Sequence, residues 1–125
     1  MNIKKFVVVL SILAVLVAGS VVSAGALTPV HVSSFKASYA GGQIKATTRV
    51  LDSLNKPVSS AAVKVSFEKE GKPIIFRTGM TNANGLVTLS AAVPAGKWLV
   101  CVEEIHKIGY EYNPLKNTCA TIQVP

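Results

Sequence analysis

Apolar and polar residues alternate one by one in several stretches of the chain, which is the pattern of β-strands with one buried face. The clearest stretches run over residues 43–50 and 63–68. The same alternation returns at residues 87–91, 98–102 and 118–124, and a looser version covers residues 30–39. The side chains predicted to face the core are Ile44, Ala46, Thr48, Val50, Val63, Val65, Phe67, Val87, Leu89, Ala91, Trp98, Val100, Val102, Ala120, Ile122 and Val124.

Turn-forming residues separate these stretches at short and regular distances. Turns are predicted at Gly41-Gly42 and at residues 52–57, 68–73, 81–85 and 94–96. Asn84-Gly85 suits positive φ, so it is expected to close a hairpin between the strands on either side. With a further strand beginning at Ile74, about seven strands result. The sequence therefore predicts a single, seven-stranded, antiparallel, all-β sandwich.

The first 24 residues have the three parts of a secretory signal peptide. Lys4 and Lys5 precede an apolar stretch, and small residues end at Ala24. We expect cleavage after Ala24, with Ala26 as an alternative, which makes residues 25–125 the mature domain. An uncleaved membrane anchor is the competing interpretation, but the apolar stretch lies at the lower end of the about 17–25 residues that a spanning helix needs. No twin arginine precedes this stretch, so the general secretion route is expected.

Both cysteines lie in the part that is expected to be exported. Because exported proteins meet oxidising conditions, Cys101 and Cys119 are predicted to form a disulfide. Two free thiols or a metal pair are the alternatives, and the sequence offers no further metal ligands at short spacing. Each cysteine falls on the side of its strand opposite to the core residues. A cross-strand disulfide on the outer face of the last hairpin is therefore expected.

The chain is basic, with 13 Lys and Arg residues against 6 Asp and Glu residues and a formal net charge of +7. Loss of Lys4 and Lys5 with the leader lowers this charge to +5. The basic residues are spread over nearly every predicted strand and turn, and aromatic residues are few, so nucleic-acid binding is not expected. Attraction to anionic glycans or to a cell surface follows from net charge alone. Simple solubility and protection of strand edges by lysines is the plainer interpretation.

No constellation for catalysis or metal binding emerges from the sequence. Glu103, Glu104 and His106 form the one acid–histidine cluster, but alternation along a strand is expected to turn Glu103 and His106 to opposite sides. Residues 82–85 echo part of a calcium loop without its aspartates or its distal glutamate. No serine has a histidine near it in sequence, and oxidised cysteines are not nucleophiles. We therefore expect no enzyme, no cofactor and no metal.

The connection before the last strand is the expected recognition surface, because loops on a rigid scaffold commonly bind ligands. It is long and rich in Gly, Tyr and Asn. The residues proposed to contact a ligand there are His106, Lys107, Tyr110, Tyr112 and Lys116.

Four short motifs between Ile44 and Val102 resemble those of known secreted modules. They are Val50-Leu51-Asp52 followed by Lys56-Pro57-Val58, Ala62-Val63-Lys64-Val65, Thr81-Asn82-Ala83-Asn84-Gly85, and Ala95-Gly96-Lys97-Trp98. This arrangement resembles bacterial immunoglobulin-like domains of the invasin and intimin type. It equally resembles carboxypeptidase regulatory-like, or prealbumin-like, domains. The tail from Gly109 to Asn117 is similar to terminal immunoglobulin-like domains of secreted bacterial enzymes. The resemblance implies a seven-stranded sandwich in adhesins, surface proteins or enzyme appendages, and it implies no activity.

Two functions remain from these observations. The first is a secreted, non-enzymatic module for binding or adhesion to a surface, a polymer or a protein, located outside the cell, at its surface or in the periplasm. The second is a structural accessory or inhibitor-like partner of a secreted enzyme. A small hydrolase is disfavoured because no nucleophile–base or carboxylate pair is evident. No membrane contact is expected after cleavage of the leader.

Overall fold

The computed structural model of the chain describes residues 26–116 and 118–125. The predicted leader and its cleavage site lie outside these residues. Nowhere in the described part is there a helix with the length and apolar character needed to cross a bilayer.

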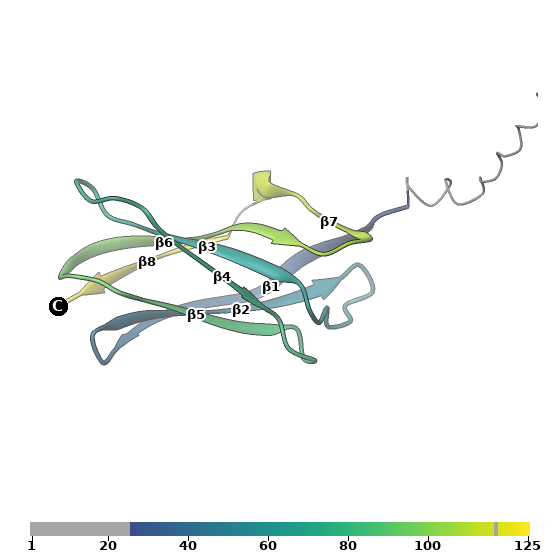
Figure 1. Cartoon of the computed structure of the whole chain (residues 1–125), viewed down its shortest axis with the longest axis horizontal. Coiled ribbons are helices and arrows are strands. Elements are labelled where there is room, and N and C mark those ends of the chain that lie inside the picture. Colours follow the sequence, from purple (N-terminus) through teal and green to yellow (C-terminus); the bar gives the residue numbers. More distant parts are fainter. Residues whose placement is uncertain (1–25, 117) are drawn as a thin grey trace, which may run out of the picture.

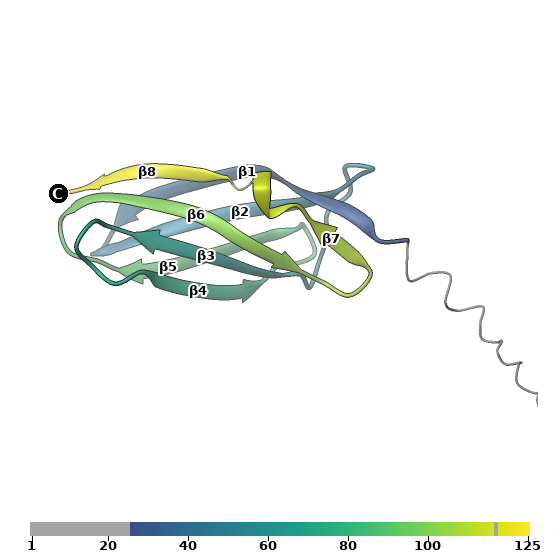
Figure 2. The same ribbon diagram turned by 90° about the horizontal axis from the view of Figure 1, so that it is seen from above.

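The described chain is all-β and forms two four-stranded sheets that pack face to face (Figure 1 and Figure 2). The first sheet has the strand order β5-β2-β1-β7, and the second has the order β4-β3-β6-β8. Residue 26 and the C-terminus lie at opposite ends of the long axis (Figure 1). The elements are β1 (Thr28–Ala40), β2 (Gln43–Asp52), β3 (Ala62–Glu68), β4 (Ile75–Met80), β5 (Leu86–Ala92), β6 (Gly96–His106), β7 (Tyr110–Tyr112), the 3₁₀ helix η3 (Pro114–Lys116) and β8 (Cys119–Val124).

Two features differ from the predicted seven-stranded antiparallel sandwich. The described residues contain an eighth strand, β7, and it runs parallel to the start of β1, with Thr28 opposite Tyr110. The backbone N–H of Thr28 also donates to the carbonyl of Gly109 at 3.0 Å. With three residues, β7 is too short to produce an alternating pattern, so the sequence gives no sign of it.

The predicted core is confirmed. Of the sixteen side chains expected to face inward, all are buried except Ala120 and Ile122 on β8, which are half-buried. Trp98 is 1 % exposed, and its indole N–H donates to the carbonyl of Pro94 at 3.0 Å, so its polar atom is satisfied inside the core. The alternation placed these residues correctly because each strand has one face against the opposite sheet.

A β-bulge explains the loose pattern of β1. Val32 pairs with Val50, but the next pair joins Ser34 to Arg49, so β1 contains one residue more than β2 over this stretch. The extra residue shifts the alternation by one position. Val32 before the bulge and Phe35 after it therefore both pack against the core.

A second bulge lies in β6. Lys64 on β3 pairs with Glu104, whereas Val65 pairs with Val102, so Glu103 is the additional residue. Strict alternation would point Glu104 inward. The bulge instead brings Ile105 to the inner side, where it is 7 % exposed.

The turn at residues 82–85 does not close the hairpin that Asn84-Gly85 predicts. The strands on either side belong to different sheets, since β4 pairs with β3 and β5 pairs with β2. Asn82 shapes this turn because its side-chain oxygen accepts hydrogen bonds from the backbone N–H groups of Asn84 and Leu86. Gly85 has φ of 76°, and its carbonyl accepts from the N–H of Val50 on β2. The turn thus directs the chain across the sandwich.

Candidate binding surfaces

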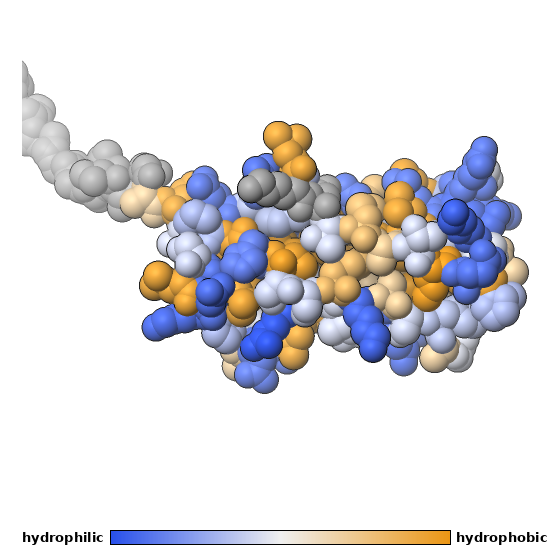
Figure 3. Space-filling view, turned by 180° about the vertical axis from the view of Figure 1, so that it is seen from behind, coloured by the Kyte–Doolittle hydropathy of each residue, from blue (hydrophilic) through white to orange (hydrophobic). Residues whose placement is uncertain are grey.

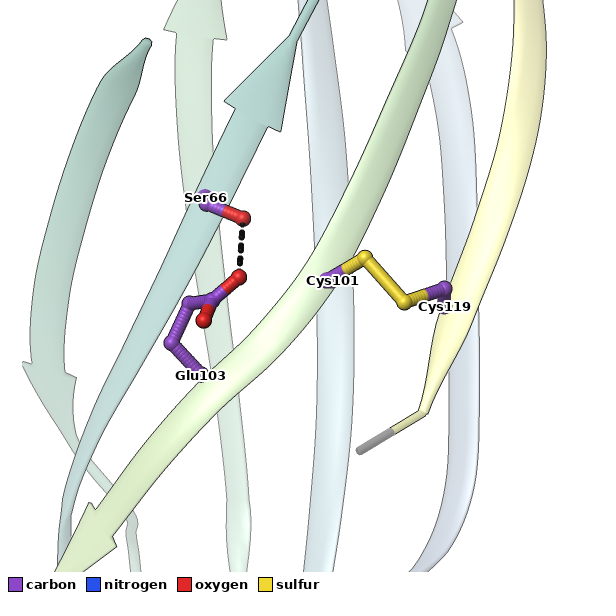
Figure 4. The surroundings of a disulfide bond; sticks show 4 residues. All are labelled: Ser66, Cys101, Glu103 and Cys119. Carbon is purple, nitrogen blue, oxygen red and sulfur yellow. Dashed lines mark hydrogen bonds between the residues drawn. A yellow bond between two sulfur atoms is a disulfide. The ribbon is translucent and has the colours of Figure 1, made fainter. Parts of the chain in front are cut away.

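The predicted disulfide is confirmed, on the outer face of the second sheet (Figure 4). Cys101 and Cys119 are direct partners on β6 and β8, with an S–S distance of 2.09 Å. Beside them, Ser66 Oγ donates to Glu103 Oε2 at 2.7 Å, which joins β3 to β6 (Figure 4). The alternation over residues 63–68 turns Ser66 to the side away from the core, yet Ser66 is 1 % exposed, and Cys101 is 7 % exposed. Neighbouring side chains therefore cover the middle of this outer face.

The proposed recognition residues between 106 and 116 occupy different environments. Lys107 Nζ donates to the carbonyl of Ser59 at 2.5 Å and lies 5.2 Å from the centre of the Tyr110 ring. Tyr110 and Tyr112 are half-buried and pack against the core, whereas His106 is exposed. Lys116 belongs to η3. Lys107 and Tyr110 thus stabilise the connection itself, and ligand contact by this group stays a prediction.

The same region contains an open hollow of about 410 Å³ between β6 and β7. Glu103, Glu104, His106, Glu111 and Tyr112 are among its lining residues. The expectation that Glu103 and His106 face opposite sides is wrong, because the bulge at Glu103 changes the alternation. Burial, followed by the negative charge of Glu103, raises the pKa of Tyr112 above its usual value.

Apolar side chains lie in a band between β1 and β8, on the side of the molecule seen in Figure 3. Val32, Phe35 and Ile122 are half-buried there. A smaller hollow of about 230 Å³ continues this band, with Val30 and Tyr112 in its wall. Part of the apolar surface of β1 and β8 is thus open to solvent on this side.

The outer face of the first sheet has a different composition, which we call the basic face. It consists of the outward-facing residues of β1 from Ser34 onward, of β2 as far as Arg49, and of β5. Three residues are cations and five carry hydroxyl groups. The residues of the basic face are Ser34, Lys36, Ser38, Ala40, Gln43, Lys45, Thr47, Arg49, Leu86, Thr88, Ser90 and Ala92.

The register of the three strands orders the basic face into rows. Lys36, Thr47 and Thr88 form one row, and the two threonine hydroxyls are hydrogen-bonded at 3.0 Å. Lys45 and Arg49 lie two positions before and after Thr47 on β2, which is about 7 Å along the strand in each direction. The three cations therefore surround one hydroxyl pair. All three are exposed.

Sequence reasoning treated the basic residues as evenly spread and so missed this face. The alternation over residues 43–50 correctly turned Lys45 and Arg49 outward. The sequence did not assign Lys36 to a face, because the bulge shifts the alternation of β1. The register between β1 and β2 also cannot be predicted from the sequence of either strand alone.

In residues 26–116 and 118–125, no group of three or more His, Cys, Asp or Glu side chains could hold a metal ion. Asp52 is a turn residue whose carboxylate accepts from the backbone N–H groups of Lys56 at 2.9 Å and Leu54 at 2.8 Å. Both hydrogen bonds lower the pKa of Asp52, and the bond from Lys56 has the larger effect. Its role is to shape the connection between β2 and β3.

Comparison with known proteins identifies no relative. No family model, no curated protein and no solved structure matches the chain. The function is therefore argued from the residues and their geometry.

Proposed function

We propose that this chain is an exported, non-enzymatic binding module with an immunoglobulin-like arrangement of its two sheets, and that it attaches to a cell surface or extracellular polymer. The two-sheet architecture and the motif resemblance between Ile44 and Val102 support the immunoglobulin-like assignment. The disulfide and the signal-like start of the chain support export, because disulfides persist in oxidising compartments.

The observation that carries this function is the composition of the basic face. Lys36, Lys45 and Arg49 are exposed in three successive rows, separated by small hydroxyl side chains. Short side chains leave a level surface on which an extended partner can lie along the strands. A regular sheet also fixes the backbone positions of these residues without the ordering cost that a loop would have.

The test measures retention of the protein on isolated cell-envelope material. The wild type is compared with a variant in which Lys36, Lys45 and Arg49 are all replaced by Gln. A matched control carries Gln at the exposed residues Lys56, Lys72 and Lys97, so it loses the same charge away from the basic face. We expect the wild type and the control to be retained and the basic-face variant to be lost.

Two outcomes would overturn the proposal. Equal retention of the basic-face variant and the control would exclude this face as the attachment surface. Capture of a single enzyme from the secreted fraction, without retention on envelope material, would instead favour the second function, an accessory or inhibitor-like partner of that enzyme.

A further inference from the structure

We infer that the partner of the basic face is a linear polysaccharide that carries anionic groups, an inference that rests on the proposed function and names its ligand class. The cations Lys36, Lys45 and Arg49 and the hydroxyls around them are the groups that would recognise it. Two properties of the face, its charge and its lack of aromatic groups, lead to this class.

The basic face differs in charge from the second sheet of the molecule. The twelve residues of the basic face include no carboxylate, whereas the second sheet carries both signs, with the cations Lys64, Arg77 and Lys97 and the acids Glu68, Glu103 and Glu104. The first sheet has two acidic residues, Asp52 on β2 and Glu111 on β7, and they pair with Val30 and Pro29, which precede the bulge on β1. The basic face therefore presents positive charge that no acidic residue within it offsets. Its charge is complementary to that of a polyanion.

The spacing of the cations fits an extended polymer. Arg49, Lys36 and Lys45 occupy successive rows about 7 Å apart and alternate between β2 and β1. Because the cations alternate between two strands about 4.8 Å apart, neighbouring cations are about 8 Å apart along the diagonal. This distance is comparable to the screening length of about 8 Å at physiological ionic strength, so neighbouring cations can act on one anionic chain. A single small anion would meet only one or two of them.

The side chains between the cations select a polysaccharide among polyanions. Ser38, Thr47 and Ser90 have hydroxyl groups that both donate and accept hydrogen bonds, which suits the hydroxyl groups of sugars. The basic face has no aromatic side chain on which nucleic-acid bases could stack. Its one large apolar residue, Leu86, is half-buried, so it offers nothing to insert into a lipid surface.

The experiment measures binding of the protein, expressed from the full chain, to polygalacturonate and to the same polysaccharide after full methyl esterification. The ester removes the negative charge and leaves the sugar chain intact. We expect binding to polygalacturonate and none to the esterified polymer. The affinity for polygalacturonate should decrease by roughly tenfold or more between 50 and 200 mM salt, because salt screens the three ionic contacts. The Gln variant of Lys36, Lys45 and Arg49 should bind at least tenfold more weakly, and the Gln variant of Lys56, Lys72 and Lys97 should bind as the wild type does.

The remaining arms separate failure of this inference from failure of the proposed function. Equal binding to the charged and the esterified polymer, lost in the basic-face variant, would overturn the anionic class and leave the attachment function intact. Tighter binding to single-stranded DNA or to phosphatidylglycerol vesicles than to polygalacturonate would overturn the polysaccharide assignment. Binding to polygalacturonate that the basic-face variant retains in full would overturn both.

Discussion

Cys101 and Cys119 lie directly opposite each other on β6 and β8, with their Cα atoms 4.0 Å apart. Their disulfide covalently ties β8, an edge strand of the second sheet, to its neighbour. The connection between these strands is long and contains β7 and η3. A turn of this length does not set the pairing register of its strands, so the disulfide supplies that constraint.

Replacing both cysteines with Ala should destabilise the fold by about 3 kcal/mol, because the disulfide closes a loop with a sequence separation of 18 and so restricts the unfolded chain. For a domain of this size, such a loss lowers the melting temperature by roughly 12–24 °C. Thermal unfolding of the variant, and of the wild type with and without reductant, measures this effect. A melting temperature that reduction leaves unchanged would contradict it.

Replacing Thr81 with Val should destabilise the fold by roughly 2–4 kcal/mol. Thr81 is 5 % exposed, and its hydroxyl donates to the carbonyl of Val58 at 2.6 Å and accepts from the N–H of Ala61 at 2.9 Å. The substitution leaves both backbone groups buried without a partner. Urea unfolding gives the free energy, and Thr81→Ser, which keeps the hydroxyl, should recover most of the loss.

The same substitution at Thr48 should have the opposite sign. Thr48 is fully buried, and within the described residues its hydroxyl has no hydrogen-bond partner. Val has the same shape without the polar atom, so Thr48→Val should be neutral or stabilise the fold by about 1 kcal/mol. Urea unfolding of this variant beside Thr81→Val compares the two sites directly. A loss of stability at Thr48 equal to that at Thr81 would show that its hydroxyl is paired in solution.

Gly85 and Gly41 should respond differently to replacement with Ala, although both have positive φ. A Cβ atom at Gly85 would come within 2.5 Å of the carbonyl oxygen of Val50, while a Cβ atom at Gly41 would meet nothing within 4 Å. Gly41→Ala should cost about 1–2 kcal/mol for its backbone conformation alone. Gly85→Ala should cost about 3 kcal/mol or more, because a backbone clash adds to that cost. Chemical denaturation of both variants measures the difference, and equal losses would contradict the close approach.

Asp52 should make the folded state sensitive to acid. Hydrogen bonds from Lys56 and Leu54 lower its pKa in the folded protein, so the carboxylate binds its proton less readily there than in the unfolded chain. Its contribution to stability is therefore present above the unfolded pKa of about 3.9 and is lost as the pH falls through the lower folded pKa. Unfolding measured between pH 6 and pH 2 should show a shallower decline for Asp52→Asn than for the wild type. Parallel curves would contradict this.

The fold was predictable from the sequence as far as strict alternation extends. Ile44 and Val50, or Trp98 and Val102, lie in stretches without a bulge, and the sequence assigned each to the correct face. The alternation rule cannot predict the bulge at Glu103, because an extra residue in a strand need not differ in type from its neighbours. The alternation therefore misjudged how Glu103 and His106 lie relative to each other.

Long-range pairing limited the rest of the prediction. Asn84-Gly85 correctly indicated a turn, but the next strand pairs with β2, which lies far earlier in the chain and whose Val50 N–H bonds to the carbonyl of Gly85. The basic face escaped the sequence for the same reason. Lys36 becomes a neighbour of Thr47 only through the register of β1 and β2. The composition gives the number of basic residues, but it does not show that three of them lie on one face.

The bulge in β1 gives this strand an unusual tolerance to a change of length. Ser33 is surplus to the pairing, since Val32 and Ser34 already oppose the consecutive residues Val50 and Arg49. Loss of Ser33 would restore simple alternation and would leave Val32 and Phe35 on the inner side, still opposite Val50 and Thr48. A deletion inside a strand ordinarily inverts every residue beyond it. Here the middle of the first strand is a position at which the gene can lose a codon and keep the same interior.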